Sequence, residues 1–213
     1  MSRAIVIGAT GLVGKCLVRQ LLEDPRYTSV TALVRRKTPV QHQKYQEHVV
    51  NFDEPASFAE LVRGDVLFSS MGTTRSQAGS LAAQRTVDYT YQFEVAKLAA
   101  EHGVSTYVLV SSGAAKATSL YPYLKMKGEL ERDVQTLGFG SVHILRPGLL
   151  GGEREQARFG EGFALSALGA LNAVGLFRSL RPISGEQVAV AMRHAATLSG
   201  TRVHEPAELF NPS

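Results

Sequence analysis

Tryptophan is absent from this chain of 213 residues, and cysteine occurs once, at Cys16. A single cysteine excludes an internal disulfide framework and is typical of a protein from a reducing compartment. Cys16 falls in an apolar helical stretch, so we interpret it as a packing residue rather than a reactive thiol. The six histidines show no metal-ligand spacing such as His-Glu-x-x-His, and the sequence therefore predicts no metal site.

Long hydrophobic runs are also missing. The longest apolar segment, residues 163–177, would span about 22 Å as a helix, whereas the hydrocarbon core of a bilayer is about 30 Å thick. Residues 1–3 lead directly into a short apolar strand, without the pattern of a signal peptide. We therefore expect a cytoplasmic protein that has no membrane partner.

A strong charge of one sign is missing too. Lys and Arg together number 23 and Asp and Glu 19, which gives a net charge of +4. The one tight basic group is Arg35-Arg36-Lys37, whereas binding to nucleic acid needs many Lys and Arg side chains on one face. We therefore expect a small-molecule substrate and no nucleic acid. The length and a hydrophobic content of 44% fit one globular domain, residues 1–213.

Short β-branched runs alternate with longer helical patterns through the first two thirds of the chain. The predicted strands are residues 4–7, 30–34, 49–52, 66–69, 106–110 and 142–145. The predicted helices between them are residues 12–22, 56–62, 86–101 and 122–137. Nearly continuous apolar strands separated by helices predict a parallel sheet covered on both faces, which is a doubly wound α/β fold.

The last third of the chain loses this alternation. After Arg146 the sequence predicts a small substrate-facing lobe over residues 148–185 and a final helix near residues 186–198. An edge strand is expected at residues 208–210. The carboxyl ends of parallel strands share one edge of the sheet, where such folds bind their ligands, so the residues that follow each strand are the candidates for chemistry.

The first strand ends in a glycine-rich turn, Gly8-Ala9-Thr10-Gly11-Leu12-Val13-Gly14, which opens the first helix. Glycines let a backbone approach a pyrophosphate closely, and the start of a helix supplies free N–H groups and partial positive charge. Ala9 makes the match to the narrower dinucleotide fingerprint imperfect. The position after the first strand of an α/β pattern nevertheless predicts a dinucleotide site formed by this turn.

The second strand ends at Arg35 and Arg36. An acidic residue at this place binds the ribose 2′-hydroxyl of NAD, whereas arginine accommodates the 2′-phosphate of NADP. A guanidinium holds phosphate through two hydrogen bonds, so this strand end predicts NADP(H) as the cofactor. The alternative is an ordinary solvated basic turn.

The third and fourth strand ends carry weaker signals. Asp53 could accept hydrogen bonds from the adenine amino group, or it could cap a helix that starts at Pro55, and the sequence does not separate these two roles. At the fourth strand end, Gly72 and Thr73 follow Ser70 and Met71 and place small residues where the backbone passes beside a cofactor.

Two Tyr-x-x-x-Lys pairs overlap near residue 122, Tyr121/Lys125 and Tyr123/Lys127. A lysine four residues after a tyrosine shares its helix face, where the ammonium lowers the pKa of the phenol. The stripe that continues Tyr123 and Lys127 is apolar, and Pro122 places Tyr121 before the helix. We therefore predict that Tyr123 and Lys127 face the protein, where they serve chemistry or merely pack.

Two serines, Ser111 and Ser112, follow the fifth strand. A serine hydroxyl at this sheet edge and the phenol of Tyr123 at a helix start could converge on one substrate carbonyl. Beside a nucleotide-binding turn, these groups form a candidate reductase site.

Taken together, these residues resemble an atypical short form of the extended short-chain dehydrogenases/reductases. The resemblance is to the nucleoside-sugar-epimerase-like oxidoreductases that include the human Tat-interacting tumour-suppressor protein. It covers about residues 3–150. It is carried by Gly8-Ala9-Thr10-Gly11 with Gly14, Arg35-Arg36, Gly72-Thr73-Thr74-Arg75, Ser111-Ser112-Gly113-Ala114, the segment from Tyr123 to Glu129, and Arg146-Pro147-Gly148.

The resemblance implies a role for each matching position. Tyr123 would exchange the proton, and Lys127 would lower its pKa and hold the nicotinamide ribose. Ser112, in preference to Ser111, would polarise the carbonyl, and Arg146-Pro147 would flank the nicotinamide.

The sequence thus favours an NADPH-dependent oxidoreductase that acts on a small carbonyl or alcohol. The alternative is a redox-sensing or regulatory protein that binds NADP(H) without turnover. The predicted helix at residues 86–101 carries apolar residues on two faces, so we also expect a homodimer, unless the second face packs on a neighbouring helix of the same chain.

Overall fold

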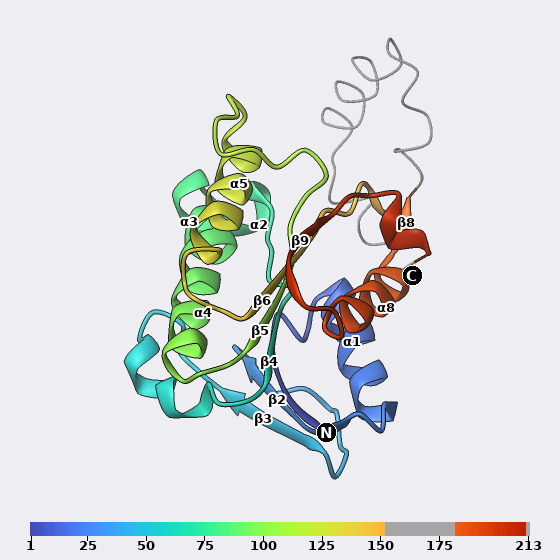
Figure 1. Cartoon of the computed structure of the whole chain (residues 1–213). Coiled ribbons are helices and arrows are strands. Elements are labelled where there is room, and N and C mark those ends of the chain that lie inside the picture. The colour runs from blue at the N-terminus through green and yellow to red at the C-terminus, as the bar shows by residue number, and fades with distance from the viewer. Residues whose placement is uncertain (152–181, 212–213) are drawn as a thin grey trace.

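The computed structural model describes residues 1–151 and 182–211 and contains a seven-stranded parallel sheet (Figure 1). Its strands lie in the order β3-β2-β1-β4-β5-β6-β9, and each neighbouring pair is parallel. The strands are β1 (Ser2–Ile7), β2 (Tyr27–Val34), β3 (Tyr45–Val49), β4 (Val66–Ser69), β5 (Thr106–Val110), β6 (Ser141–Leu145) and β9 (Gly200–His204). Two short strands, β7 (Leu150–Gly151) and β8 (Ile183–Ser184), pair separately. The predicted doubly wound α/β fold is confirmed.

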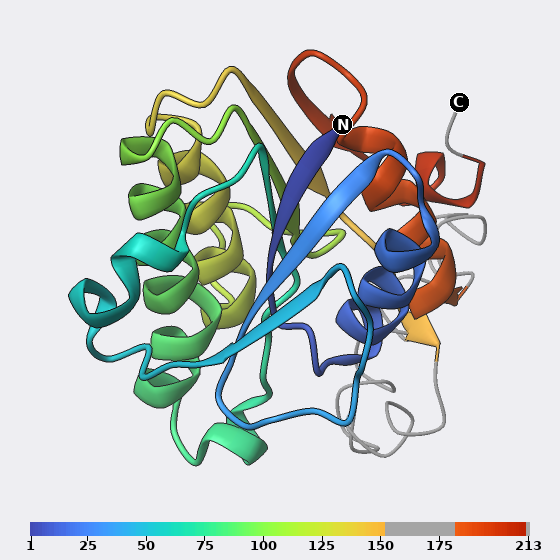
Figure 2. The same ribbon diagram turned by 90° about the horizontal axis from the view of Figure 1, so that it is seen from below.

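Helices cover both faces of the sheet (Figures 1 and 2). One face carries α1 (Leu12–Glu23) and α8 (Gly185–Ala195), and the other carries α4 (Tyr91–Glu101) and α5 (Pro122–Val134). The shorter helical elements are η1 (Pro55–Leu61), α2 (Arg75–Ala78), α3 (Leu81–Arg85), the π-helical turn η2 (Thr86–Thr90) and η4 (Glu208–Phe210). None of the helices in the described ranges is long and apolar enough to cross a bilayer.

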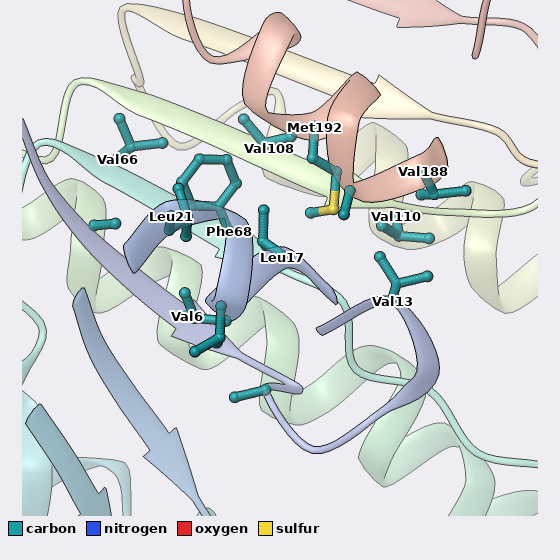
Figure 3. Packing of buried hydrophobic residues seen from close by; sticks show 14 of the residues in the cluster. Val6, Val13, Leu17, Leu21, Val66, Phe68, Val108, Val110, Val188 and Met192 are labelled. Atoms are coloured by element: carbon teal, nitrogen blue, oxygen red, sulfur yellow. The ribbon is translucent and has the colours of Figure 1, made fainter. Parts of the chain in front are cut away.

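The two helical layers bury two separate apolar clusters against the sheet. Leu17 and Leu21 of α1 recur at helical spacing and pack with Phe68 of β4 and with Val188 and Met192 of α8 (Figure 3). Cys16 packs against this cluster, as predicted. The cluster on the other face joins η1, α4 and α5 to the sheet. Because helices pack on both faces of the sheet, the carboxyl ends of the strands are held together at one edge.

The third strand lies earlier than expected, at Tyr45–Val49 rather than at residues 49–52. It is an edge strand that is only half-buried, so its sequence is polar and lacks the apolar signal of a central strand. The apolar signal of residues 49–52 comes from Val49, Val50 and Phe52. Val49 ends the strand and is exposed, whereas the Phe52 ring packs at 5.6 Å from Phe58 and 5.5 Å from Tyr91.

The expected edge strand at residues 208–210 is wrong, because Glu208–Phe210 forms the 3-10 helix η4. The edge strand is instead Gly200–His204, which pairs with β6. Its first three residues are exposed and two of them are polar, so it carries no strand pattern. Leu209, the apolar residue behind the wrong prediction, is buried in the cluster beneath α8.

The helix expected over residues 86–101 begins as the π-helical turn η2 before α4 continues to Glu101. The segment expected at residues 56–62 is a 3-10 helix, and α2 and α3 were not predicted. By contrast, α5 begins at Pro122 with Tyr121 as its N-cap, as predicted. Most of the expected lobe at residues 148–185 lies outside the described residues, as does the apolar segment 163–177.

Candidate functional site

The chain leaves β1 toward β2 on one side and later returns to place β4 on the other, so the strand order reverses at the carboxyl end of β1. Ligands of open α/β sheets bind at such a point. A groove of about 620 Å³ lies there. It is lined by Gly8, Ala9, Thr10, Gly11, Leu12, Lys15, Cys16, Leu33, Val34, Arg35, Phe52, Ser70, Met71, Gly72, Thr73, Gln77 and Val87.

The glycine turn forms one wall of this groove. Gly8 has φ +81°, and a Cβ there would lie 2.5 Å from the carbonyl carbon of Ser70, so only glycine fits between β1 and β4. The amide of Gly11 closes the turn by donating to the Gly8 carbonyl at 3.0 Å. Gly8, Thr10, Gly11 and Leu12 line the groove, as predicted for a cofactor-facing turn.

Val13 and Gly14 do not line the groove, although the sequence placed them with the same turn. A Cβ on Gly14 would lie 2.0 Å from the Gly8 carbonyl oxygen, so this glycine allows α1 to pack against the turn. Val13 is buried in the core cluster beneath α1. Both residues shape the turn from behind.

The start of α1 is open to a ligand. Its N-cap is Gly11, and no side chain caps it, so the first amides of the helix offer unpaired N–H groups and partial positive charge. Lys15, one turn into the helix, also lines the groove. These features suit a pyrophosphate, because its oxygens need several donors and a positive potential.

Arg35 lines the groove at the end of β2, whereas Arg36 is exposed and lies outside its walls. Lys15 and Arg35 are the charged residues of the described lining, and the lining contains no carboxylate. The groove is therefore electropositive and fits a ligand that carries several phosphates.

Asp53 lies beside the groove but does not line it. Its Oδ1 accepts a hydrogen bond of 2.6 Å from the Tyr91 hydroxyl, which raises the pKa of that phenol. The capping alternative is wrong, because the N-cap of η1 is Glu54 and no side chain caps that helix. The neighbouring Phe52 supplies the apolar wall at this end of the groove.

Gly72 and Thr73 form the wall that follows β4. The Thr73 amide donates to Asp88 Oδ2 at 2.9 Å, and the Thr73 carbonyl accepts from Gln84 Nε2 at 3.2 Å. Both partners are buried side chains, so the peptide of Thr73 is held from two sides.

The two Tyr-x-x-x-Lys pairs separate as the helical stripes predicted. Tyr121 is 70% exposed and Lys125 is exposed, whereas Lys127 is 3% exposed. The stripe that continues Lys127 is fully buried at Leu130 and Val134. Tyr123, at the start of the same stripe, is half-buried. The Tyr123/Lys127 pair therefore faces the protein.

Lys127 forms an ion pair with Asp88, a residue that was not predicted to belong to the site. Its Nζ lies 3.2 Å from Oδ1 of Asp88, and both side chains are buried. Burial lowers the pKa of the ammonium, but the charges of Asp88, Tyr123 and Glu131 outweigh burial and raise it. Lys127 and Tyr123 do not line the groove, and Asp88 connects them to it through Thr73.

The two serines at the end of β5 have different environments. Ser111 is buried, and its Oγ has no hydrogen-bond partner within the described part of the chain. Ser112 is half-buried, and its carbonyl accepts from the Ala115 amide at 3.0 Å. Neither serine lines the groove.

Arg146 and Pro147 are not brought to the groove that the sequence assigned to them. The Arg146 guanidinium donates to Glu131 Oε2 at 2.6 Å and to Glu205 Oε1 at 2.9 Å, in a separate hollow of about 390 Å³ beside α5. Pro147 is buried, and its carbonyl accepts from the Gly113 amide. These long-range partners, which no local pattern indicates, occupy the polar groups of both residues.

Contributors to the site that were missed from the sequence include Lys15, Phe52, Gln77 and Asp88. Cys16, interpreted from the sequence as a packing residue, also lines the groove. The position of Lys15 one turn after the glycine turn could have indicated it. Asp88 also left a signal, because it is a carboxylate between two apolar stripes of the predicted helix 86–101. Phe52 was assigned to a strand, and nothing in the sequence indicates Gln77.

A family described as NAD(P)H-binding matches residues 8–163. The protein named "Protein FMP52, mitochondrial" from Eremothecium gossypii is 40% identical over 216 residues, covering 98% of this chain and 96% of the relative. A short-chain dehydrogenase/reductase of Saccharomyces cerevisiae superposes with a TM-score of 0.70 at 15% identity, covering 92% and 90% of the two chains. MoeE5, solved with UDP-glucose and NAD, superposes with a TM-score of 0.69 at 17% identity, covering 94% and 74%.

These comparisons correct the expected location of the protein and support the family resemblance only at the level of the fold. Relatives from several fungi are named mitochondrial proteins, which contradicts the expectation of a cytoplasmic protein. The structural neighbours share the short-chain dehydrogenase/reductase and epimerase-like fold, whereas the narrower resemblance to the human Tat-interacting protein stays a prediction. With a matching domain over most of its length and a relative that is 40% identical over nearly all of it, the chain belongs to the NAD(P)H-binding family, together with the proteins named FMP52.

Proposed function

We propose that this protein is an NADPH-dependent oxidoreductase that acts on a small carbonyl or alcohol. The observation that carries the proposal is the groove at the strand-order reversal, with a glycine turn, an uncapped helix start and two cations on its walls. Such a groove fits the phosphates of a nicotinamide dinucleotide. NADPH, when bound, supplies the hydride, and the chain supplies binding, orientation and the proton.

The preference for NADPH over NADH rests on Arg35. Its guanidinium lies at the end of β2, where the fold places the adenosine ribose, and no carboxylate of the described groove lining is available for a 2′-hydroxyl. A 2′-phosphate can take two hydrogen bonds from this side chain. We assign Arg36, which is exposed, a supporting role through its charge.

Tyr123 is the proposed proton donor and acceptor. Its phenol would transfer a proton to the substrate oxygen as the carbonyl carbon receives hydride, and would take it back in the reverse direction. Lys127, as the neighbouring ammonium, would favour the phenolate. Ser112 would hold the carbonyl oxygen. Ser111 is the second choice: its Oγ is buried and has no hydrogen-bond partner among the described residues.

The proposal extends to the substrate and to the location of the protein. We propose a small substrate, held by the proposed lobe at residues 148–185 of the single domain. We also propose a mitochondrial location, from the names of the relatives. The homodimer stays a prediction, because Tyr89 of the second apolar face donates to Asp133 of α5 in the same chain, which accounts for that face without a partner.

One observation favours a second function, a sensor that binds NADPH without turnover. Tyr123 and Lys127 stand outside the described groove lining, and Asp88 already pairs with the lysine. A sensor would need the groove but no proton donor.

A screen of aldehydes and ketones with the purified protein, followed by NADPH absorbance, separates the two functions. The proposal expects oxidation of NADPH with at least one carbonyl and a loss of about 100-fold or more in kcat for Tyr123→Phe, with NADPH affinity unchanged. Binding without oxidation across a broad panel would favour the sensor. Full turnover by Tyr123→Phe would remove the tyrosine from its role.

A further inference from the structure

Asp88 is a buried carboxylate in an unusual turn. It lies in η2, where the Tyr91 amide donates to the Thr86 carbonyl five residues earlier, and its side chain is 1% exposed. Single π-helical turns inside α-helices widen the helix by one residue and are frequent at functional sites. A carboxylate at such a position needs partners that offset the loss of its hydration.

The two oxygens of this carboxylate contact two different parts of the site. Oδ2 accepts the Thr73 amide at 2.9 Å, and Thr73 lines the groove. Oδ1 lies 3.2 Å from Nζ of Lys127, whose side chain shares a helix stripe with Tyr123. One side chain therefore connects the wall of the cofactor groove to the Tyr123/Lys127 pair.

Hydrogen bonds on the surrounding elements fix the position of this carboxylate. The Asp88 carbonyl accepts from Gln92 Nε2 at 2.7 Å, and Gln92 Oε1 accepts from the Ser69 hydroxyl of β4 at 2.7 Å. Two further hydrogen bonds join this region to α5: Arg85 of α3 donates to Glu129 at 2.6 Å, and Tyr89 of η2 donates to Asp133 at 2.7 Å. The π-helical turn is thus fastened both to the sheet and to α5.

The charge of Lys127 depends on this arrangement. The groups that interact electrostatically with its ammonium are Asp88, Tyr123 and Glu131. Glu131 is itself paired with Arg146, and Tyr123 is negative only as phenolate, so Asp88 is the counter-charge in direct contact with Lys127. A buried lysine without a counter-charge releases its proton at a much lower pH, and an unpaired buried charge also destabilises the fold.

We propose that Asp88 is a positioning residue of this site: its carboxylate keeps the Lys127 ammonium protonated and in place beside Tyr123, and fastens it to the Thr73 peptide in the groove wall. The inference rests on the proposed function, in which Lys127 acts on Tyr123. It adds a residue that touches neither substrate nor cofactor and acts through the lysine.

The test follows the titration of Lys127 by NMR of [ε-13C]lysine, with the signal assigned by its loss in Lys127→Met. In Asp88→Asn, the acid dissociation constant of Lys127 is expected to rise at least tenfold. The affinity for NADPH, which falls as Lys127 loses its proton at alkaline pH, is expected to fall at a pH at least about one unit lower than in the wild type. Glu129→Gln is the matched control, because it removes another carboxylate of α5 that is ion-paired, with Arg85 of α3, and should leave the Lys127 midpoint unchanged.

A Lys127 midpoint in Asp88→Asn within about twofold of the wild-type dissociation constant would overturn the role of Asp88. If Asp88→Asn does not fold, the double variant Asp88→Asn/Lys127→Met decides, since removal of both charges should restore a wild-type melting temperature. A double variant that also fails to fold would overturn the inference. A wild type that binds neither NADPH nor NADH sinks the proposed function instead, so the two failures are distinguishable.

Discussion

In the groove beside the glycine turn, the ligand-facing groups are largely backbone: the turn allows close approach, and the uncapped start of α1 offers N–H groups. Among the described lining residues, Lys15 and Arg35 add charge. Around α5, β6 and β9 many polar groups are side chains that pair with one another away from solvent, such as Asp88 with Lys127, Arg146 with Glu131 and His143 with His204. We call the first region the groove and the second the buried network.

The difference lies in what each region requires of the sequence. The groove requires small residues at fixed spacing, because a Cβ at Gly8 or Gly14 would overlap backbone atoms of β4 or of the turn. The buried network requires charge pairs between elements that are far apart in the chain, such as 39 residues for Asp88 and Lys127 by their numbers. A substitution in the groove should therefore act on shape and affinity, whereas one in the network should act on charge and stability.

The largest effect is expected from Gly14→Ala, which tests whether the groove depends on close backbone packing. The new Cβ would lie 2.0 Å from the Gly8 carbonyl oxygen, so α1 must shift away from the turn. We expect a loss of about 3 kcal/mol or more in unfolding free energy and no measurable NADPH binding. Chemical denaturation and a fluorescence titration measure both.

Gly103→Ala is the control for this substitution. Gly103, unlike Gly14, has a positive φ of 74°, but a Cβ there would meet no atom within 4 Å, so only local strain of about 1 kcal/mol is added. If Gly14→Ala were no more destabilising than Gly103→Ala, close packing of the turn would not be the reason for glycine at position 14.

An intermediate effect is expected from acidification, which tests the buried network. Burial and the neighbouring positive groups His143, Arg202 and His194 lower the pKa of His204 to about 4, against the opposing charge of Glu208. Because the folded pKa lies below the unfolded value of 6.5, the contribution of His204 to stability is complete above about pH 6.5 and is lost as pH falls toward 4. Between pH 7.5 and 5 this loss amounts to about 2 kcal/mol.

Urea denaturation at the two pH values measures this loss. His204→Gln should reduce the pH dependence, because glutamine does not titrate. An unchanged slope in His204→Gln would show that acid instability arises elsewhere in the network.

The smallest effect is expected from Arg35→Ala, which separates charge from shape within the groove. Loss of a charged hydrogen-bonding partner should weaken NADPH binding about 10- to 30-fold and leave NADH binding and stability nearly unchanged. Arg36→Ala, which alters an exposed neighbour outside the groove, should weaken NADPH binding less than about threefold. Equal losses for NADPH and NADH in Arg35→Ala would exclude a contact with the 2′-phosphate.

The part of the molecule that the sequence predicted is the part built from local patterns. The glycine turn, the central strands and the orientation of Tyr123 and Lys127 each depend on spacing within about ten residues, and the structure places them as expected. The edge strands β3 and β9 were misplaced because half-exposed strands do not need apolar residues.

The site residues that the sequence misplaced are those whose partners lie far away in the chain. Arg146 follows a strand end, yet Glu131 of α5 and Glu205 after β9 hold its guanidinium away from the groove. Asp88 was missed because its partners, Thr73 and Lys127, lie 15 and 39 residues away by their numbers and belong to different elements. Local motifs give no information on such pairs.

The most direct test of the central claim is a calorimetric titration of the purified wild-type protein with NADPH and, separately, with NADH. The account predicts saturable 1:1 binding of NADPH, with a dissociation constant at least about tenfold lower than that for NADH. No saturable binding of either dinucleotide would contradict it.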